Sequence, residues 1–142
     1  MKGIKLFSLI TLLNLSIIGY SQAGVYSKTN TPKNKDTELK WTVTLNKNGS
    51  FIYNFYRKHK KGVPEEENFY GKGTWRLNGK IINFFTNPET EINEIYKMDF
   101  TNTKARYVSK SPRNESAKTT KTAIKFYQSD LFAITGLELF KQ

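Results

Sequence analysis

Two Asn-Gly dipeptides, each set between runs of alternating apolar and polar residues, restrict the possible folds of this chain more than any other feature. They occupy residues 48–49 and 78–79, inside the stretch 41–86. Asparagine and glycine tolerate the positive φ angles of tight turns, so this pattern predicts a β-hairpin at each site. Two successive hairpins with aromatic residues at every second position predict an antiparallel β-sheet.

The first hairpin is expected to turn through a three-residue loop, residues 47–49, with Gly49 in the left-handed conformation. The predicted cross-strand pairs are Leu45 with Phe51, Val43 with Tyr53, and Trp41 with Phe55.

The second hairpin is expected to use a two-residue type I′ loop at residues 78–79. That register pairs Leu77 with Lys80, Trp75 with Ile82, and Gly73 with Phe84. It directs Trp75 into the core and Arg76 outward, and it lets the Phe84 ring lie over the bare backbone of Gly73.

Residues 1–23 are predicted to be a signal peptide that is removed on export. Two early lysines precede the apolar residues 6–18, and Ser21 and Ala23 supply the small side chains of a cleavage site, with cleavage after Ser21 as the alternative. The apolar run is shorter than the ~20 residues that a membrane-spanning helix needs, and polar residues interrupt it. The chain has no Cys, so we expect neither a cysteine-linked lipid anchor nor disulfides.

Removal of residues 1–23 leaves residues 24–142, a length typical of one domain. We expect an all-β fold of about nine short strands, a small antiparallel meander that closes into a barrel, with a β-sandwich as the alternative. The expected strands outside the hairpins are residues 24–27, 92–101, 104–109, 122–127 and 132–140. The charged residues 57–67 and the polar residues 111–120 are expected to form solvated loops.

Several of these segments follow a known pattern. They are the strand 41–45, the turn 48–49, Phe51, the Gly-Thr-Trp at 73–75, Leu77, the turn 78–79, the strand 80–86 and the final strand ending at 137–140. In these respects the chain resembles the small lipocalin-like β-barrels that many bacteria export behind a signal peptide. The resemblance implies a single lipocalin-like domain over residues 24–142 and a small apolar ligand inside the barrel. A neighbouring barrel family of copper-stress lipoproteins carries a Cys pair that this chain lacks, so no metal site is implied.

One face of the two hairpins is apolar and is expected to point into the barrel. The candidate ligand-lining residues are Trp41, Val43, Phe51, Tyr53, Phe55, Trp75, Ile82 and Phe84. The alternative interpretation of the same residues is a filled core, because small barrels are usually packed with side chains. Tyr53 is the interior residue expected to orient a ligand through its hydroxyl.

The sequence gives little support for catalysis. Its one histidine, His59, lies in a basic segment, without a second His or a Cys to share a metal or activate a nucleophile. The glutamates 65–67 lack the alternating spacing of calcium-binding loops. We therefore expect a non-enzymatic protein with no catalytic residues, no cofactor and no bound metal.

Positive charge is the other notable feature. The formal net charge is +11, and loss of the two signal-peptide lysines leaves about +9. One acidic residue accompanies the seven basic residues between positions 104 and 125: Lys104, Arg106, Lys110, Arg113, Lys118, Lys121 and Lys125. Basic barrels with exposed aromatics can bind nucleic acid, but a protein outside the cytoplasm meets anionic lipid and polysaccharide instead.

Two functions thus remain open ahead of a third, an enzyme, and beside a basic surface that serves solubility alone. The first is an exported lipocalin-like protein that binds a small apolar ligand. The alternative is a basic surface-interaction module that docks on anionic envelope components or on a partner protein. Either protein is expected in the periplasm or outside the cell, without nucleic acid as a partner and without a transmembrane segment after signal removal.

Overall fold

The structure is a computed structural model that describes residues 20–33, 35–109 and 121–142. The predicted all-β fold is confirmed, since this part of the chain holds nine strands and only short helical turns. The strands are β1 (Gly24–Asn30), β2 (Thr37–Leu45), β3 (Ser50–His59), β4 (Glu66–Asn78), β5 (Ile81–Phe85), β6 (Tyr96–Met98), β7 (Thr103–Val108), β8 (Ala123–Gln128) and β9 (Glu138–Lys141). The helical turns are η1 (Tyr20–Gln22) and α2 (Pro88–Glu91).

Eight strands form a closed antiparallel barrel, so the alternative β-sandwich is wrong. Around the barrel the order is β1, β2, β3, β4, β5, β7, β8 and β9, and β9 pairs again with β1. The ninth strand, β6, pairs in parallel with β4 outside this ring. Closure leaves no unpaired edge along the ring, which removes a template for aggregation.

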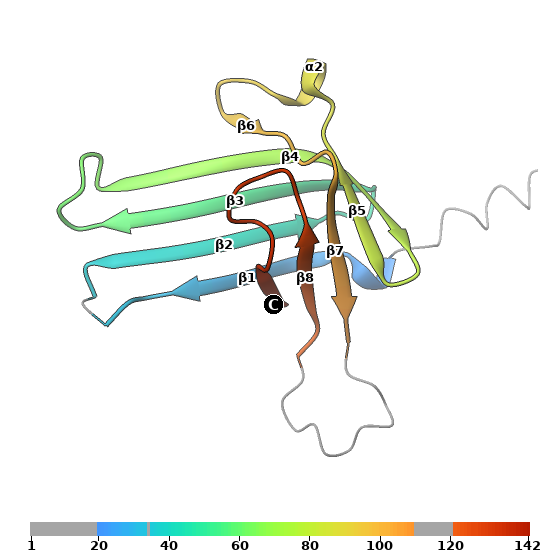
Figure 1. The fold of residues 1–142 in the computed structure, drawn as a ribbon, viewed down its shortest axis with the longest axis horizontal. Helices are drawn as coiled ribbons and strands as arrows, with labels where there is room; N and C mark the ends of the chain where they lie inside the picture. The colour runs from blue at the N-terminus through green and yellow to red at the C-terminus, as the bar shows by residue number, and fades with distance from the viewer. Residues whose placement is uncertain (1–19, 34, 110–120) are drawn as a thin grey trace, which may run out of the picture.

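One side of the barrel is much longer than the other. In Figure 1, β2, β3 and β4 extend far beyond the point where β5, β7 and β8 cross them. The pairing agrees: β4 pairs with β3 over residues 66–74 but with β5 only over residues 74–78. We call the projecting part, residues 37–42, 54–59 and 66–70, the mouth sheet.

The first hairpin has the predicted register. Leu45 pairs with Phe51, Val43 with Tyr53, and Trp41 with Phe55. The loop is closed by a hydrogen bond from the Asn46 N–H to the Ser50 carbonyl at 2.9 Å, and Gly49 has φ 89°.

The second hairpin is shifted by two residues from the predicted register. Its last pair is Asn78 with Ile81, so the loop is residues 79–80 and Trp75 faces Phe84. Gly79, with φ 62°, occupies the first loop position, where a type II′ turn takes glycine. A shift of two residues keeps every side chain on its predicted face, because the side-chain period of a strand is two. Trp75 is accordingly buried and Arg76 is exposed, as predicted.

The expected solvated loop over residues 57–67 is wrong. β3 continues to His59 and β4 begins at Glu66, so the connection is residues 60–65. The basic run on β3 faces the acidic run on β4: Arg57 is opposite Glu67 and Lys58 opposite Glu66, and both pairs form salt bridges. Opposite charges on neighbouring strands stabilise the sheet, whereas like charges along one strand point to alternate faces.

Two other expected strands are shorter than predicted. The segment 92–101 contains only the three residues of β6, and α2 precedes it with Asn87 as its N-cap. The segment 132–140 becomes a strand only at Glu138, and residues 129–137 form the β8–β9 loop. The expected strands at residues 24–27, 104–109 and 122–127 are present as β1, β7 and β8.

Side chains fill the closed part of the barrel. The ring of Phe100, which enters from the segment before β7, has its centroid 5.2 Å from that of Phe51 and 4.9 Å from that of Tyr53. Gly71 makes room for it, since a Cβ at this position would overlap the Phe100 ring. The buried apolar core comprises Tyr26, Val43, Leu45, Phe51, Tyr53, Trp75, Ile82, Phe84, Phe100, Ala105, Ile124, Phe126, Ile134, Leu137 and Leu139.

Most of the predicted signal peptide, residues 1–19, lies outside the described residues, so export stays a prediction. Within the described residues, we find no helix of the length and apolar character needed to cross a membrane.

Candidate functional site

An apolar cleft opens where the mouth sheet leaves the closed barrel. Its volume is about 410 Å³, within the range of small-molecule sites. Its lining comes from β2, β3, β4, β6 and the β8–β9 loop: Trp41, Tyr53, Phe55, Arg57, Phe69, Met98, Phe132, Ala133 and Ile134. We call this the mouth cleft.

Strand register places three aromatic residues side by side in the mouth cleft. Trp41, Phe55 and Phe69 are direct cross-strand neighbours on β2, β3 and β4. The Trp41 and Phe55 ring centroids are 5.2 Å apart and those of Phe55 and Phe69 are 5.8 Å apart, with stacked planes in both pairs. The next row inward is Val43, Tyr53 and Gly71, so this aromatic row continues the barrel interior toward solvent.

The β8–β9 loop supplies the other side of the mouth cleft. Ile134 is buried in the core, whereas the Phe132 side chain is fully exposed. The loop is held at its start by Ser129, whose Oγ lies 2.8 Å from Thr103 Oγ1 and accepts a hydrogen bond from the Leu131 N–H. A hydrogen bond from the Gly136 N–H to the Phe126 carbonyl holds its other end. The structure therefore holds a large apolar side chain in water beside an apolar cleft.

Tyr53 lies at the base of the mouth cleft and is only 2% exposed. Within the described residues its hydroxyl has no hydrogen-bond partner, yet no fully buried polar side-chain atom there is unsatisfied. The small exposed area of Tyr53 must therefore include the hydroxyl oxygen. Burial raises the pKa of Tyr53 far above its usual value, so the hydroxyl keeps its proton.

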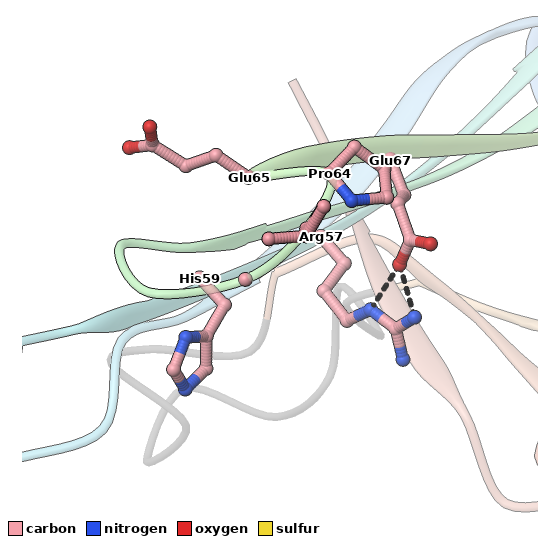
Figure 2. A pocket seen from close by; sticks show the side chains of 7 residues that line it. Arg57, His59, Pro64, Glu65 and Glu67 are labelled. Atoms are coloured by element: carbon pink, nitrogen blue, oxygen red, sulfur yellow. Dashed lines mark hydrogen bonds and ion pairs between the residues drawn. The ribbon is translucent and has the colours of Figure 1, made fainter.

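Arg57 stands at the outer rim of the mouth cleft. Its Nε and Nη2 both donate to Oε2 of Glu67, and the two side chains face each other in Figure 2. The guanidinium carbon lies 5.8 Å from the Phe69 ring centroid, a cation–π distance. The Arg57 side chain remains 47% exposed, so it can still approach a bound molecule.

A smaller pocket of about 290 Å³ lies at the tip of the β3–β4 hairpin. His59 is among its lining residues, and Nδ1 of His59 accepts a hydrogen bond from the Lys61 N–H. In Figure 2 the imidazole ring points away from Glu65 and from Glu67. Among the residues that the structure describes, no group of three or more His, Cys, Asp or Glu side chains is placed to hold a metal ion.

The predicted ligand-lining residues divide into two groups. Three of them line the mouth cleft: Trp41, Tyr53 and Phe55. The other five are buried in the packed core: Val43, Phe51, Trp75, Ile82 and Phe84.

Sequence reasoning missed six residues of the mouth cleft: Arg57, Phe69, Met98, Phe132, Ala133 and Ile134. The sequence did contain a signal for Arg57 and Phe69. If the basic run after Phe55 is paired with the acidic run before Phe69, then Phe69 lies opposite Phe55. Met98 and the loop residues reach the cleft through the tertiary fold, and no local pattern indicates them.

The structure describes four of the seven residues of the predicted basic surface, Lys104, Arg106, Lys121 and Lys125. Lys110, Arg113 and Lys118 lie outside the described residues, and Lys121 is exposed just before β8. The register of β4, β5, β7 and β8 brings four cations onto the outer barrel face, which we call the basic wall: Arg76, Lys104, Arg106 and Lys125.

None of the salt bridges found among the described residues involves the basic wall. Arg106 lies 6.0 Å from the ring centroid of Tyr127, an exposed aromatic on the same face. Glu138 on β9 is the register neighbour of Lys125 and marks one border of the wall.

Comparisons of this chain with protein-family models, with curated proteins and with solved structures gave no match.

Proposed function

We propose that this protein is a non-enzymatic, exported, lipocalin-like binding protein that holds a small apolar ligand in the mouth cleft. The observation that carries the proposal is the combination of an open apolar cleft with large exposed apolar side chains on both of its sides. Phe132 is fully exposed and Phe69 is 42% exposed. Covering such surface is favourable by roughly 25 cal/mol per Å², so an apolar ligand is stabilised there.

The filled interior limits where this ligand lies. The rings of Phe51, Phe84 and Phe100 pack against one another within the closed part of the barrel. Small barrels with packed interiors bind ligands at their open ends or on their faces. We therefore propose that the ligand lies on the aromatic row of the mouth sheet.

The test is a titration with N-phenylnaphthylamine, an uncharged dye whose fluorescence rises in an apolar environment. We expect saturable binding that changes little with salt, because the contacts are apolar. Replacement of the two exposed phenylalanines, Phe69→Ser with Phe132→Ser, should weaken binding about tenfold or more, since each removes apolar contact area.

The control is Phe85→Ser, which removes a ring about as exposed as that of Phe69, at 52% exposure, beside a separate pocket of about 350 Å³ on the outer face of β5. It should leave dye binding unchanged. Absence of dye binding to the folded protein, or equal losses in both sets of variants, would contradict the proposal.

A second candidate function is supported by the basic wall, which gathers four cations without a salt bridge among the described residues. Such a face attracts anionic lipid headgroups, at about 1 kcal/mol per basic residue near the surface. We propose it as a docking face for anionic envelope lipids, independent of the mouth cleft.

Binding to phosphatidylglycerol vesicles, with phosphatidylcholine vesicles as reference, tests this second candidate. Lys104→Glu with Arg106→Glu should abolish binding, and high salt should do the same. Lys40→Glu with Lys97→Glu makes the same charge change at exposed positions on β2 and β6, outside the wall. Equal losses from both double variants would show a general charge effect and remove the wall as a site.

A further inference from the structure

We infer that the ligand of the mouth cleft carries an oxygen acceptor, a carboxylate or a carbonyl group, on an otherwise apolar body. This inference rests on the proposed function and specifies its ligand class. It comes from the polar groups among the nine lining residues. Among the side chains, those groups belong to Tyr53, Trp41 and Arg57; the indole and the guanidinium only donate hydrogen bonds, and the Tyr53 hydroxyl can donate one.

Tyr53 makes the strongest contribution. A tyrosine hydroxyl that is nearly buried normally finds a partner, because leaving it unpaired forfeits its hydrogen bonds to water. The hydroxyl of Tyr56, on the same strand, donates to Oε1 of Glu66 at 3.2 Å. Tyr53 has no such partner within the described residues, and its hydroxyl retains contact with the cleft. An acceptor on the ligand would complete its hydrogen bonding.

Trp41 shows the same contrast with the other tryptophan. Nε1 of Trp75 donates to the Asn46 carbonyl at 3.0 Å. Within the described residues no hydrogen bond involves the Trp41 indole, whose side chain lines the cleft. Its N–H is thus a second donor without a partner among the described residues, on a side chain of the cleft lining.

The charges around the mouth cleft also favour an acceptor. Arg57 lines the rim, and Lys28 stands opposite Trp41 in register, one strand beyond the aromatic row. Among the described residues, Glu67 is the one carboxylate paired with these cations, and its Oε2 accepts hydrogen bonds from Arg57. A ligand with an ammonium group would lie near the cations Arg57 and Lys28, whereas a carboxylate or carbonyl oxygen could accept hydrogen bonds from the Tyr53, Trp41 and Arg57 donors.

The experiment is displacement of N-phenylnaphthylamine by three ten-carbon amphiphiles, all used below their micelle concentrations. They are decanoate, its methyl ester and decylammonium. We expect decanoate and the ester to displace the dye at concentrations at least about tenfold lower than decylammonium requires. Tighter binding of decanoate than of the ester would identify a carboxylate, and equal binding a carbonyl acceptor; both results support the inference.

Tyr53→Phe is the informative variant, because it removes one oxygen and keeps the ring. It should weaken decanoate binding about tenfold more than it weakens dye binding, because the dye offers the hydroxyl no oxygen acceptor. Tyr56→Phe is the matched control: it removes a hydroxyl from the same strand, where Tyr56 donates to Glu66 on the outer face at 3.2 Å. It should change neither affinity.

The two proposals fail in different ways. Dye binding together with equal affinities for the three amphiphiles, or with no effect of Tyr53→Phe, would overturn the acceptor inference and leave the apolar site intact. Failure of the dye to bind would overturn the site itself.

Discussion

Single residues in this barrel differ sharply in what they contribute, and Tyr53 and Trp75 show the two extremes. Both point into the barrel from neighbouring regions of the sheet. The indole of Trp75 is packed in the core and its N–H is satisfied by the Asn46 carbonyl. Tyr53 is equally buried, but its hydroxyl has no partner within the described residues. Trp75 therefore serves the stability of the core, whereas Tyr53 belongs to the proposed binding site.

Trp75→Ala should therefore lower the free energy of unfolding by about 3–5 kcal/mol, as removal of a large buried aromatic does. Arg76→Ala, one residue along β4 but exposed, should change it by less than about 0.5 kcal/mol. Urea unfolding of the two variants and the wild type measures both values. A loss below about 1 kcal/mol for Trp75→Ala would contradict its assignment to the core.

Tyr53 should also make stability depend on alkaline pH. Burial raises its pKa in the folded state above the value near 10 of an unfolded chain. Below pH 10 the folded and unfolded states both hold the Tyr53 proton, so the contribution of Tyr53 to the free energy of unfolding is fully present. Above pH 10 the unfolded state releases the proton while the folded state keeps it, so stability falls by about 1.4 kcal/mol per pH unit.

Urea unfolding between about pH 9 and pH 11 tests this dependence. The alkaline loss should be shallower in Tyr53→Phe than in the wild type. Tyr26, whose pKa is also raised by burial, contributes equally in both proteins. Identical slopes would show that Tyr53 is not buried as described.

At the scale of strands and turns, β4 determines the shape of the barrel, because it pairs with β3 along one half and with β5 along the other. The change of partner occurs at residues 73–74, where β5 passes very close to β4. A Cβ on Gly73 would overlap the carbonyl oxygen of Phe85 and lie 3.0 Å from the Phe51 ring. The ring over Gly73 is thus Phe51, not Phe84 as the sequence suggested.

Gly73→Ala should destabilise the protein by about 2 kcal/mol or more, because backbone must move to admit the methyl group. Gly79→Ala provides the comparison, since a Cβ there meets no atom within 4 Å but the φ of 62° is unfavourable. It should cost about 1 kcal/mol. Thermal or urea unfolding of both variants gives the values, and a smaller loss at Gly73 than at Gly79 would contradict the close approach of β5.

The hairpins also show what a sequence can specify about strands. Gly49 fits only the three-residue loop 47–49, so the register of the first hairpin could be predicted from the sequence. The second hairpin has two registers that differ by two residues and place Trp75, Ile82 and Phe84 on the same face. The apolar pattern cannot choose between them, and the choice depends on how β5 packs on β4 and β7. The charged residues 57–67 were wrongly predicted to form a solvated loop, because the opposite charges that pair with the basic run lie on the neighbouring strand.

At the scale of the whole molecule, the packed core and the proposed binding site occupy different parts of the barrel. The closed part holds a packed core, the projecting mouth sheet carries the aromatic row and the cleft, and the outer face of the closed part carries the basic wall. The interior residues of the closed part were predictable from alternation. The mouth cleft was predictable only where it continues that alternation, at Trp41, Tyr53 and Phe55. Its remaining side depends on the β8–β9 loop, which is placed by long-range contacts.

Chemical-shift mapping by NMR tests the central claim, a ligand site on the mouth sheet, most directly. Isotope-labelled protein would be titrated with N-phenylnaphthylamine and the backbone amide shifts followed by residue. We expect the largest shifts at Trp41, Phe55, Phe69 and Phe132, with little change at Phe85 on the outer face. Shifts that centre on the basic wall, or that are absent throughout while the protein remains folded, would contradict the account.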